Sequence, residues 1–259
     1  MTSSTTTSSP HLFILTGASR GMGLAMAEQL LQPGHVLICI SRGVSPSLQA
    51  AADAAGVTLQ QWSADLTDAA SASARLGDWL KAQTADSFAS ASLINNAGVI
   101  PAIVPLRDAN VAELGSALRV GLEAPMQLTA TFLRATRGWH GPRKVLNISS
   151  GLGRRPMASQ AAYCAAKAGM DLFTRCVALE EAQLPNGARV CALAPGVIDT
   201  DMQQHLRGAD ASSFPDRGNF ESLKTKGQLS SPEDAARRVL AWLQRPDFGV
   251  EPMADVRDA

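Results

Sequence analysis

The sequence lacks an excess of charge, a long apolar run and clustered metal ligands. Lysine and arginine total 23, as do aspartate and glutamate, so the formal net charge is +0. A chain balanced in this way carries no electrostatic footprint for nucleic acid or for an anionic membrane, and we expect neither as a partner. No apolar stretch approaches the roughly 20 residues of a membrane span. The four histidines are not spaced as zinc ligands, so we expect no metal site.

Cysteine is scarce as well, and the four cysteines are widely spread. They form no CxxC pair, which favours reduced thiols in a cytoplasmic protein over a disulfide framework. Residues 1–10 are mostly serine and threonine, without the basic start and apolar stretch of a signal peptide. We expect residues 1–10 to be a disordered tail and residues 11–259 to form a single domain.

Apolar runs alternate with segments of helical periodicity along the rest of the chain. Strands are predicted at 11–16, 36–40, 57–62, 93–95, 145–149 and 190–194. Helices are predicted at 23–31, 69–83, 111–136, 161–181 and 232–243, the last with Ser231 as its N-cap. This alternation predicts an α/β protein with a doubly wound Rossmann fold, in which helices cover both faces of a mostly parallel sheet of about seven strands.

Residues 200–229 form a polar, glycine-containing and weakly periodic segment. In a doubly wound sheet, this segment would lie over the carboxyl ends of the strands, where ligands bind. We interpret residues 200–229 as a substrate lid, and the alternative is a passive surface excursion.

A glycine-rich turn, TGASRGMG, joins the first predicted strand to the first predicted helix. Glycine lets the backbone approach a pyrophosphate, and a helix N-terminus offers free N–H groups and a positive dipole end. The strand before and the helix after are the context that a dinucleotide site requires, although a purely structural turn is the alternative. The predicted cofactor-binding residues of this turn are Gly17, Ser19, Arg20, Gly21, Met22 and Gly23.

The residues that end the next strands indicate which dinucleotide binds. Ser41 and Arg42 end the second strand, and a neutral residue followed by arginine suits the 2′-phosphate of NADP better than the free ribose of NAD. Arg20 is a second candidate for the phosphate, and two solvated arginines are the alternative. Asp65 and Leu66 end the third strand, where a carboxylate can accept a bond from the adenine amine. We therefore predict NADPH/NADP+ as the cofactor.

The only tyrosine of the chain, Tyr163, precedes Lys167 by four residues on a predicted helix. The two side chains therefore share one helix face. A free phenol has a pKa near 10, and a nearby ammonium together with the positive charge of an oxidised nicotinamide favours phenolate. We predict Tyr163 as the acid, with Lys167 lowering its pKa. Ser150, after the fifth strand, is predicted to hold the substrate oxygen.

Together, the strings TGASRGMG, NNAG, NISS, YCAAK and APGVIDT resemble the short-chain dehydrogenase/reductase family over residues 11–200. The resemblance implies that Ser150 and Tyr163 meet the reacting carbonyl and that Lys167 binds the nicotinamide ribose. It favours Ser150 over Ser149 because of the distance to Tyr163 in the sequence. It also implies further cofactor-binding residues, which are Asn96, Ala97, Gly98, Tyr163, Lys167, Pro195, Gly196, Val197 and Thr200.

Residues 194–204, APGVIDTDMQQ, are similar to the sepiapterin reductase branch of that family, whose bacterial relatives reduce aromatic diketones such as benzil. In this branch an acidic residue near the C-terminus anchors the substrate, which implies Asp255 here. The alternative is that Asp255 is a solvated tail residue. Met202 would supply an adaptable apolar wall.

The chain departs from the family pattern at two positions. Gly121 stands where many members carry an asparagine that supports a proton relay, which leaves only a backbone carbonyl to hold a water. Gln160 stands where sepiapterin reductases place a tryptophan, which predicts a wider and less selective pocket.

These features predict an NADPH-dependent carbonyl reductase that transfers a hydride to a small-molecule ketone or α-diketone, sepiapterin-like or benzil-like. One alternative is an NAD-dependent alcohol dehydrogenase, which Arg42 disfavours. Another is a catalytically idle dinucleotide-binding regulator. The family resemblance implies a homodimer or homotetramer that assembles through the long helices at 111–136 and 161–181.

Overall fold

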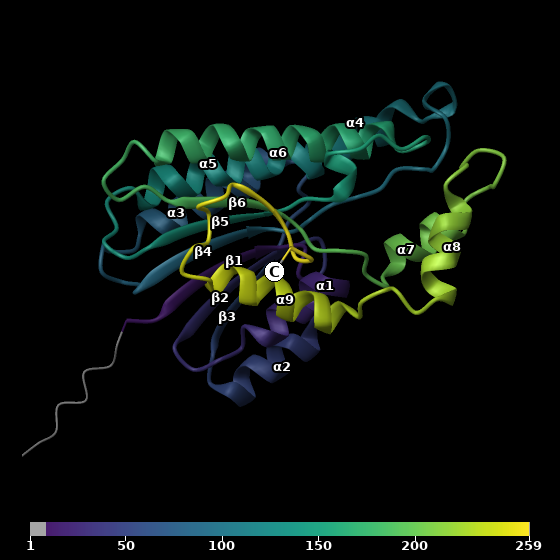
Figure 1. Ribbon diagram of the computed structural model, residues 1–259. Helices are drawn as coiled ribbons and strands as arrows, with labels where there is room; N and C mark the ends of the chain where they lie inside the picture. Colours follow the sequence, from purple (N-terminus) through teal and green to yellow (C-terminus); the bar gives the residue numbers. More distant parts are fainter. Residues whose placement is uncertain (1–8, 259) are drawn as a thin grey trace, which may run out of the picture.

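The computed structural model describes residues 9–258, so most of the predicted tail lies outside the described residues. Within the described range, seven strands form one sheet in the order β3-β2-β1-β4-β5-β6-β7, and every neighbouring pair is parallel. The predicted α/β fold class is confirmed (Figure 1). The strands are β1 (His11–Thr16), β2 (His35–Ser41), β3 (Thr58–Ser63), β4 (Ser90–Asn95), β5 (Arg143–Ile148), β6 (Arg189–Ala194) and β7 (Met253–Asp255).

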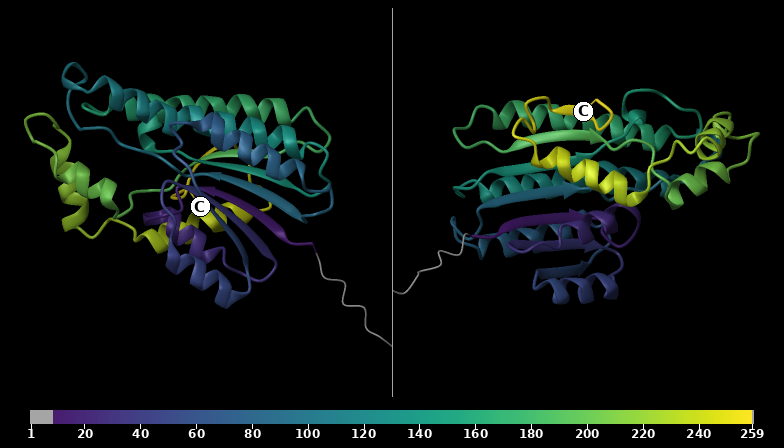
Figure 2. Two further views of the ribbon diagram at one scale, coloured as in Figure 1. Left: turned by 180° about the vertical axis from the view of Figure 1, so that it is seen from behind. Right: turned by 60° about the horizontal axis from the view of Figure 1, so that its bottom comes forward.

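Helices cover both faces of the sheet. One face carries α3 (Ala69–Lys81), α4 (Val111–Leu118), α5 (Ala124–Thr136) and α6 (Ala161–Glu181), as Figure 1 shows. The other face carries α1 (Gly21–Gln29), α2 (Pro46–Ala55) and α9 (Pro232–Gln244), and the two layers are also distinct in Figure 2. Among the described residues, none of the helices has the length and apolar character to cross a membrane.

Alternating side chains of the central strands fill two separate cores. In β1, Phe13 and Leu15 belong to the cluster beneath α1 and α9, whereas Leu12 and Ile14 belong to the cluster beneath α3 and α5. Successive side chains of a strand point to opposite faces, so a strand buried on both faces must be apolar throughout. This requirement explains why the strands of this chain are continuous apolar runs.

The elements that were not predicted from the sequence include one helix and one strand of the main sheet layers. Helix α2 begins after Ser45, whose side chain accepts a hydrogen bond from the Leu48 N–H, and it ends at Gly56 in the left-handed conformation (φ 65°). Strand β7 is only three residues long and pairs with the end of β6. The predicted cap of α9 is confirmed, since the Ser231 side chain accepts from the Asp234 N–H.

The helix predicted over residues 111–136 is interrupted. A π-helical turn, η2 (Arg119–Glu123), separates α4 from α5 and contains the buried Gly121. Insertion of a π turn changes the register of the helix by a fraction of a turn, and such turns are frequent at functional sites. The prediction of one regular helix was therefore wrong at its centre.

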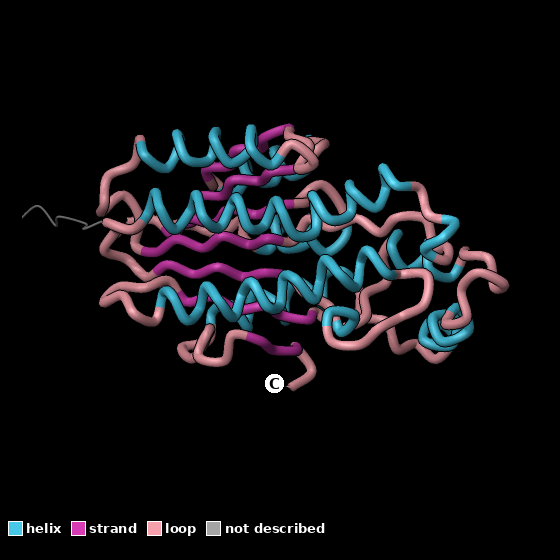
Figure 3. Tube along the Cα trace, turned by 90° about the horizontal axis from the view of Figure 1, so that it is seen from above, coloured by secondary structure: helices cyan, strands magenta, loops and turns pink. Residues whose placement is uncertain are grey.

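Residues 200–229 lie beyond the carboxyl ends of the strands, as predicted, and contain two helices, α7 (Asp201–Arg207) and α8 (Arg217–Thr225) (Figures 1 and 3). Phe214 and Phe220 stack there with their ring centroids 5.6 Å apart. They belong to a third apolar cluster, which also includes Leu206. Because the same cluster contains the buried Ile103 and Met157, the segment packs against the rest of the domain.

Candidate active site

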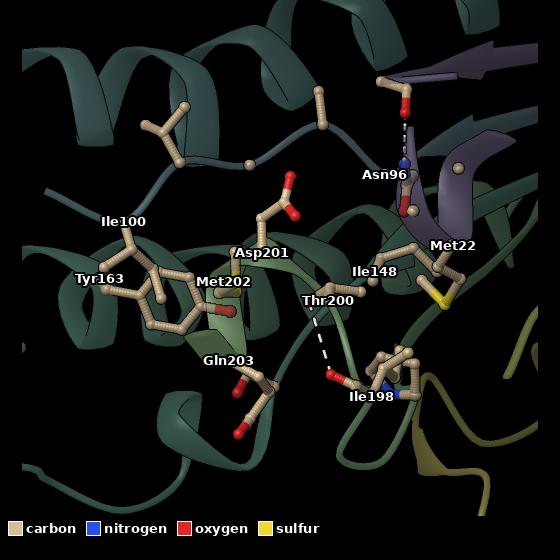
Figure 4. A pocket seen from close by; sticks show the side chains of 18 of the residues that line it. Met22, Asn96, Ile100, Ile148, Tyr163, Ile198, Thr200, Asp201, Met202 and Gln203 are labelled. Atoms are coloured by element: carbon tan, nitrogen blue, oxygen red, sulfur yellow. Dashed lines mark hydrogen bonds between the residues drawn. The ribbon is translucent and has the colours of Figure 1, made fainter. Parts of the chain in front are cut away.

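One cavity of about 700 Å³ lies at the carboxyl ends of the strands and is lined by all the residues that the sequence predicted for the cofactor, the substrate and catalysis. The chain turns in opposite directions from β1 and from β4, and ligands bind at such a switch point in open α/β sheets. In Figure 4, Tyr163 and Met202 gather at one end of the cavity and Met22 and Asn96 at the other. Among residues 9–258, no group of three or more metal-ligating side chains is present.

The glycine turn has the shape of a cradle for a phosphate group. Gly17 has a φ of 71°, and a Cβ there would lie 2.9 Å from the Ala97 Cα. A Cβ on Gly23 would collide with the Gly17 carbonyl oxygen. The Arg20 side chain forms no capping bond at the start of α1, and Gly21 and Met22 line the cavity in its first turn. The backbone of this turn therefore fits the pyrophosphate of a dinucleotide.

Asn96 and Thr16 fasten the glycine turn to the end of β4. The Asn96 amide donates to the carbonyl oxygens of Thr16 at 3.0 Å and Gly17 at 3.2 Å. The Thr16 hydroxyl accepts from the N–H groups of Asn96 and Ala97 at 2.9 and 3.0 Å. Asn96, predicted to lie along the cofactor, therefore also holds the cradle in place.

The end of β2 places one cationic side chain at the cavity without an ionic partner. The Ser41 hydroxyl is buried and accepts from the Ala18 N–H at 2.7 Å, which joins the turn to β2. Arg42 is exposed beside it, and none of the ion pairs among the described residues involves Arg42. Arg20, the second predicted phosphate ligand, instead lies 3.3 Å from Asp201 of α7, with both side chains exposed. Such an exposed pair contributes little energy.

The sequence predicted that Asp65 ends the third strand, but β3 ends at Ser63, and Asp65 lines the cavity two residues later. Its carboxylate accepts from the Thr67 N–H at 2.9 Å, and hydrogen bonding with Thr67 holds the pKa of Asp65 below its usual value. Asp65 is therefore an ionised acceptor in the cavity wall.

Tyr163 and Lys167 lie one turn apart on α6, with the Lys167 Nζ 5.7 Å from the centroid of the Tyr163 ring. The Lys167 Nζ donates to the Ile148 carbonyl at 2.8 Å. Burial lowers the pKa of Lys167 from 10.5 to about 8, while the negative charge of Asp171 acts to raise it.

The phenol of Tyr163 does not have the lowered pKa that was predicted from Lys167. Burial raises the pKa of Tyr163 to about 12, although a hydrogen bond with the Ser150 side chain acts to lower it. A phenol removed from water is poorly solvated as phenolate. The side chains of this chain therefore keep Tyr163 protonated, and a lower pKa requires a positive charge brought into the cavity.

The two serines at the end of β5 have different environments. Ser149 is 2% exposed and its hydroxyl donates to the Asp171 carboxylate. Ser150 is less buried, its hydroxyl accepts from the Leu152 N–H at 3.2 Å, and its side chain acts to lower the pKa of Tyr163. The structure thus places Ser150, the serine preferred from the sequence, next to the phenol.

The loop after β6 closes the cavity on the side of the glycine turn. Gly196 has a φ of 82°, and the Thr200 hydroxyl donates to the Ile198 carbonyl at 3.4 Å, as drawn in Figure 4. A Cβ on Gly21 would lie 3.5 Å from the Thr200 Cγ2. The loop and the glycine turn are therefore in near contact.

Asp255 ends β7 and lines the cavity, but its carboxylate is already paired. Arg257 donates to Asp255 through its backbone N–H at 3.0 Å, its Nε at 2.8 Å and its Nη2 at 2.5 Å. Asp255 is 5% exposed, so the alternative of a solvated tail residue was wrong. Hydrogen bonding with Arg257 also holds its pKa below the usual value.

The two departures from the family pattern lie outside the cavity wall. Gly121 is buried against α6, where a Cβ would lie 3.1 Å from the Ala166 Cβ. Gln160 is 1% exposed, is not among the lining residues, and its Oε1 has no hydrogen-bond partner within the described part of the chain. Gln160 therefore forms no part of the cavity wall, and the wider pocket stays a prediction.

Sequence reasoning missed several lining residues, most of them apolar. They carry no motif, and only their place in the folded chain brings them to the cavity. The missed residues include Ile100, Ser116, Leu152, Arg155, Leu206, Phe220 and Arg257.

Comparison with known proteins identifies the family. A model described as short chain dehydrogenase matches residues 11–211. The chain belongs to the short-chain dehydrogenase family. Members of this family are oxidoreductases that use nicotinamide dinucleotide cofactors, bind small-molecule substrates and are generally oligomeric.

Relatives of this short-chain dehydrogenase include two reductases. A benzil reductase ((S)-benzoin forming) from Bacillus cereus is 36% identical over 235 residues, which cover 91% of this chain and 94% of that protein. A sepiapterin reductase from Rattus norvegicus is 32% identical over 246 residues, which cover 91% of this chain and 92% of that protein. The crystal structure of the KRED1-Pglu enzyme has a TM-score of 0.78 and 26% identity, and the match covers 94% of this chain and 99% of that one. The predicted resemblance to the family and to this branch is confirmed.

Proposed function

We propose that this short-chain dehydrogenase is an NADPH-dependent carbonyl reductase acting on aromatic ketones or α-diketones. The observation that carries the proposal is that Ser150, Tyr163 and Lys167 line one cavity together with the glycine cradle, with the Lys167 Nζ 5.7 Å from the centroid of the Tyr163 ring. An alcohol-forming reduction needs an acid and an oxygen-binding hydroxyl at the same carbonyl. The benzil and sepiapterin reductases among the relatives support this direction of reaction.

The cofactor supplies the hydride when it is bound. The backbone of the glycine turn would hold its pyrophosphate, Arg42 its 2′-phosphate, and Asp65 its adenine amine. Lys167, Asn96 and the loop at residues 195–200 would hold the nicotinamide end. Arg42 supports NADP because its guanidinium has no ionic partner among the described residues and lies at the end of β2.

The chain's own residues perform the proton chemistry. Ser150 donates a hydrogen bond to the substrate oxygen and orients it toward Tyr163. Tyr163 then gives its proton to the oxygen as negative charge develops there. Its raised pKa of about 12 means that this proton is present at neutral pH. Lys167 lies beneath the ring and stabilises the phenolate that remains.

Apolar side chains in the cavity wall support an aromatic substrate. The lining includes Ile100, Leu152, Met202, Leu206 and Phe220. Side chains of this kind fit the phenyl rings of a diketone. We infer that residues 200–229 act as the lid of this cavity and that the domain at 11–259 works as one unit in the cytoplasm.

The assembly is proposed to be a homodimer or homotetramer. Leu118, Met126, Leu172 and Leu179 are large apolar side chains exposed on α4, α5 and α6. Apolar residues exposed on adjacent helices favour contact with another chain.

The experiment is a turnover assay with NADPH and with NADH over benzil, sepiapterin, simple ketones and a steroid ketone. We expect benzil reduction to be fastest and NADPH to be preferred. Arg42→Ala should raise the KM for NADPH and leave that for NADH unchanged, and Arg107→Ala, an exposed arginine outside the cavity, serves as the matched control. Equal losses with both cofactors would show that Arg42 does not bind the phosphate. Tight NADPH binding without turnover of any substrate would favour a regulator instead.

A further inference from the structure

A buried carboxylate outside the predicted site lies one helical turn beyond Lys167. Asp171 is 4% exposed and occupies position i+4 relative to Lys167 on α6. Residues four apart on a helix share one face. A charged group buried to this degree is costly unless the surrounding residues use its charge.

Asp171, on α6, contacts the end of β5 at Ser149 and the following turn at Arg154, and all three segments meet at the candidate site. Its Oδ1 accepts from the Ser149 hydroxyl, and its Oδ2 lies 3.3 Å from the Arg154 Nε. A Cβ on Gly153 would lie 3.0 Å from the same Oδ2, so the turn after Ser150 packs directly on this carboxylate. Movement of Asp171 would therefore displace the turn that carries Ser150.

The negative charge of Asp171 is only partly compensated by Arg154. A single nitrogen of Arg154 contacts the carboxylate, while its Nη2 donates to the Ala254 carbonyl at 3.0 Å. The Arg154 side chain is also about one third exposed, whereas that of Asp171 is buried. Water screens the arginine more than the carboxylate, which leaves net negative potential on the side of Lys167.

The other charged groups around Lys167 do not supply this potential. On α6 itself Lys167 faces Tyr163, which is neutral at physiological pH. The β7 side presents Asp255, which is paired with Arg257. On η2, packed against α6, the charged residues Arg119 and Glu123 are exposed, and the β4 and β5 ends present no ionisable side chain. Asp171 is thus the acid whose charge is available to Lys167.

We propose that Asp171 is a positioning residue of this site, whose charge holds Lys167 as an ammonium beside Tyr163 and whose oxygens fix the Ser149–Ser150 turn. The proposal rests on the proposed function, since the ammonium matters only if Tyr163 is the acid. Burial lowers the pKa of Lys167 to about 8 although the charge of Asp171 acts to raise it. Without Asp171, a large share of Lys167 would be neutral at physiological pH.

The test measures the protonation of Lys167 directly and needs neither substrate nor cofactor. The chain has five lysines. Carbon-13 labelling of their ε-carbons gives five NMR signals, of which Lys167 is assigned by its loss in Lys167→Met. The Lys167 signal should titrate near pH 8 in the wild type. Asp171→Asn, which keeps the shape and the hydrogen-bond acceptor, should lower this midpoint by about one pH unit.

Two further variants complete the design. Glu181→Gln is the matched control, because Glu181 is a buried acid on the same helix that pairs with Arg143, about 20 Å away along the axis. It should leave the Lys167 midpoint unchanged. Arg154→Gln removes the cation that opposes Asp171 and should raise the Lys167 midpoint. This variant therefore tests the effect of the Asp171 charge on Lys167 even if Asp171→Asn fails to fold.

The outcomes are distinct from those of the activity assays. The proposal is supported if Asp171→Asn lowers the titration midpoint of Lys167 and also moves the basic limb of the pH profile of kcat to lower pH. An unchanged midpoint in folded Asp171→Asn, or in Arg154→Gln if only that variant folds, overturns it. Failure of the wild type to reduce any carbonyl would overturn the proposed function and leave the NMR titration unaffected.

Discussion

The cavity is lined by an acid whose carboxylate is paired with a neighbouring arginine. Asp255 accepts three hydrogen bonds from Arg257, and both residues line the cavity. A carboxylate engaged in a bidentate pair has little capacity left for a hydrogen-bond donor on a substrate. At the scale of single residues, Arg257 therefore decides whether Asp255 can act as the predicted anchor.

Removal of Arg257 is predicted to change substrate preference. Arg257→Ala frees the Asp255 carboxylate, so kcat/KM for a donor-bearing substrate such as sepiapterin should rise relative to benzil by about tenfold, or 1–2 kcal/mol. Asp255→Ala in the same background should cancel the gain. If Arg257→Ala changes both substrates by the same factor, Asp255 is not within reach of the substrate.

Residue roles could be predicted only where a motif fixed them. Ser149 and Ser150 are adjacent and chemically identical, and spacing alone favoured Ser150. The reason for their different environments is Asp171, which lies 22 residues further along the chain on α6 and accepts from the Ser149 hydroxyl. The pairing of Asp255 with Arg257 and the burial of Gln160 likewise depend on packing between distant segments, which one sequence does not display.

At the scale of elements, the helices on the α3–α6 face show what periodicity can predict and what it cannot. Periodicity located α6 at its observed bounds, because its apolar face repeats over 21 residues. The π turn η2 was missed because it leaves the helical periodicity of residues 111–136 nearly intact. Strand β7 was missed because three residues give no alternation pattern, and α2 because only two of its residues are buried.

Gly121 in this π turn is predicted to tolerate the side chain that many relatives have. A Cβ at Gly121 would lie 3.1 Å from the Ala166 Cβ, so α6 must yield by a few tenths of an ångström next to Lys167. We expect Gly121→Asn to change kcat within about tenfold, because the backbone carbonyl carries any proton relay with a water. Complete loss of activity in a folded variant would mean that glycine is needed for space, and Gly115→Asn on exposed α4 is the control.

At the scale of the whole molecule, the site reduces the stability of the fold. Burial lowers the pKa of Lys167 from 10.5 to about 8, so the folded state holds the ammonium less favourably than the unfolded chain does. This penalty, about 3 kcal/mol, is complete below pH 8 and disappears as the pH rises through the unfolded value. Function is therefore retained here at the expense of stability.

Lys167→Met is accordingly predicted to be more stable than the wild type at pH 7. The free energy of unfolding should rise by about 2 kcal/mol, since the unpaired Ile148 carbonyl offsets part of the gain. Urea unfolding at pH 7 and at pH 9.5 measures the effect, and the advantage of the variant should shrink at the higher pH. A variant that is less stable than the wild type at pH 7 would contradict the account.

The most direct test of the central claim is the turnover of Tyr163→Phe with NADPH and the best substrate of the wild type. The variant keeps the ring and removes the proton donor, and because Tyr163 is the only tyrosine, no second phenol can replace it. We predict that kcat falls by on the order of 10²-fold or more while the affinity for NADPH, measured by fluorescence titration, is unchanged. Turnover close to that of the wild type would contradict the assignment of Tyr163 as the acid.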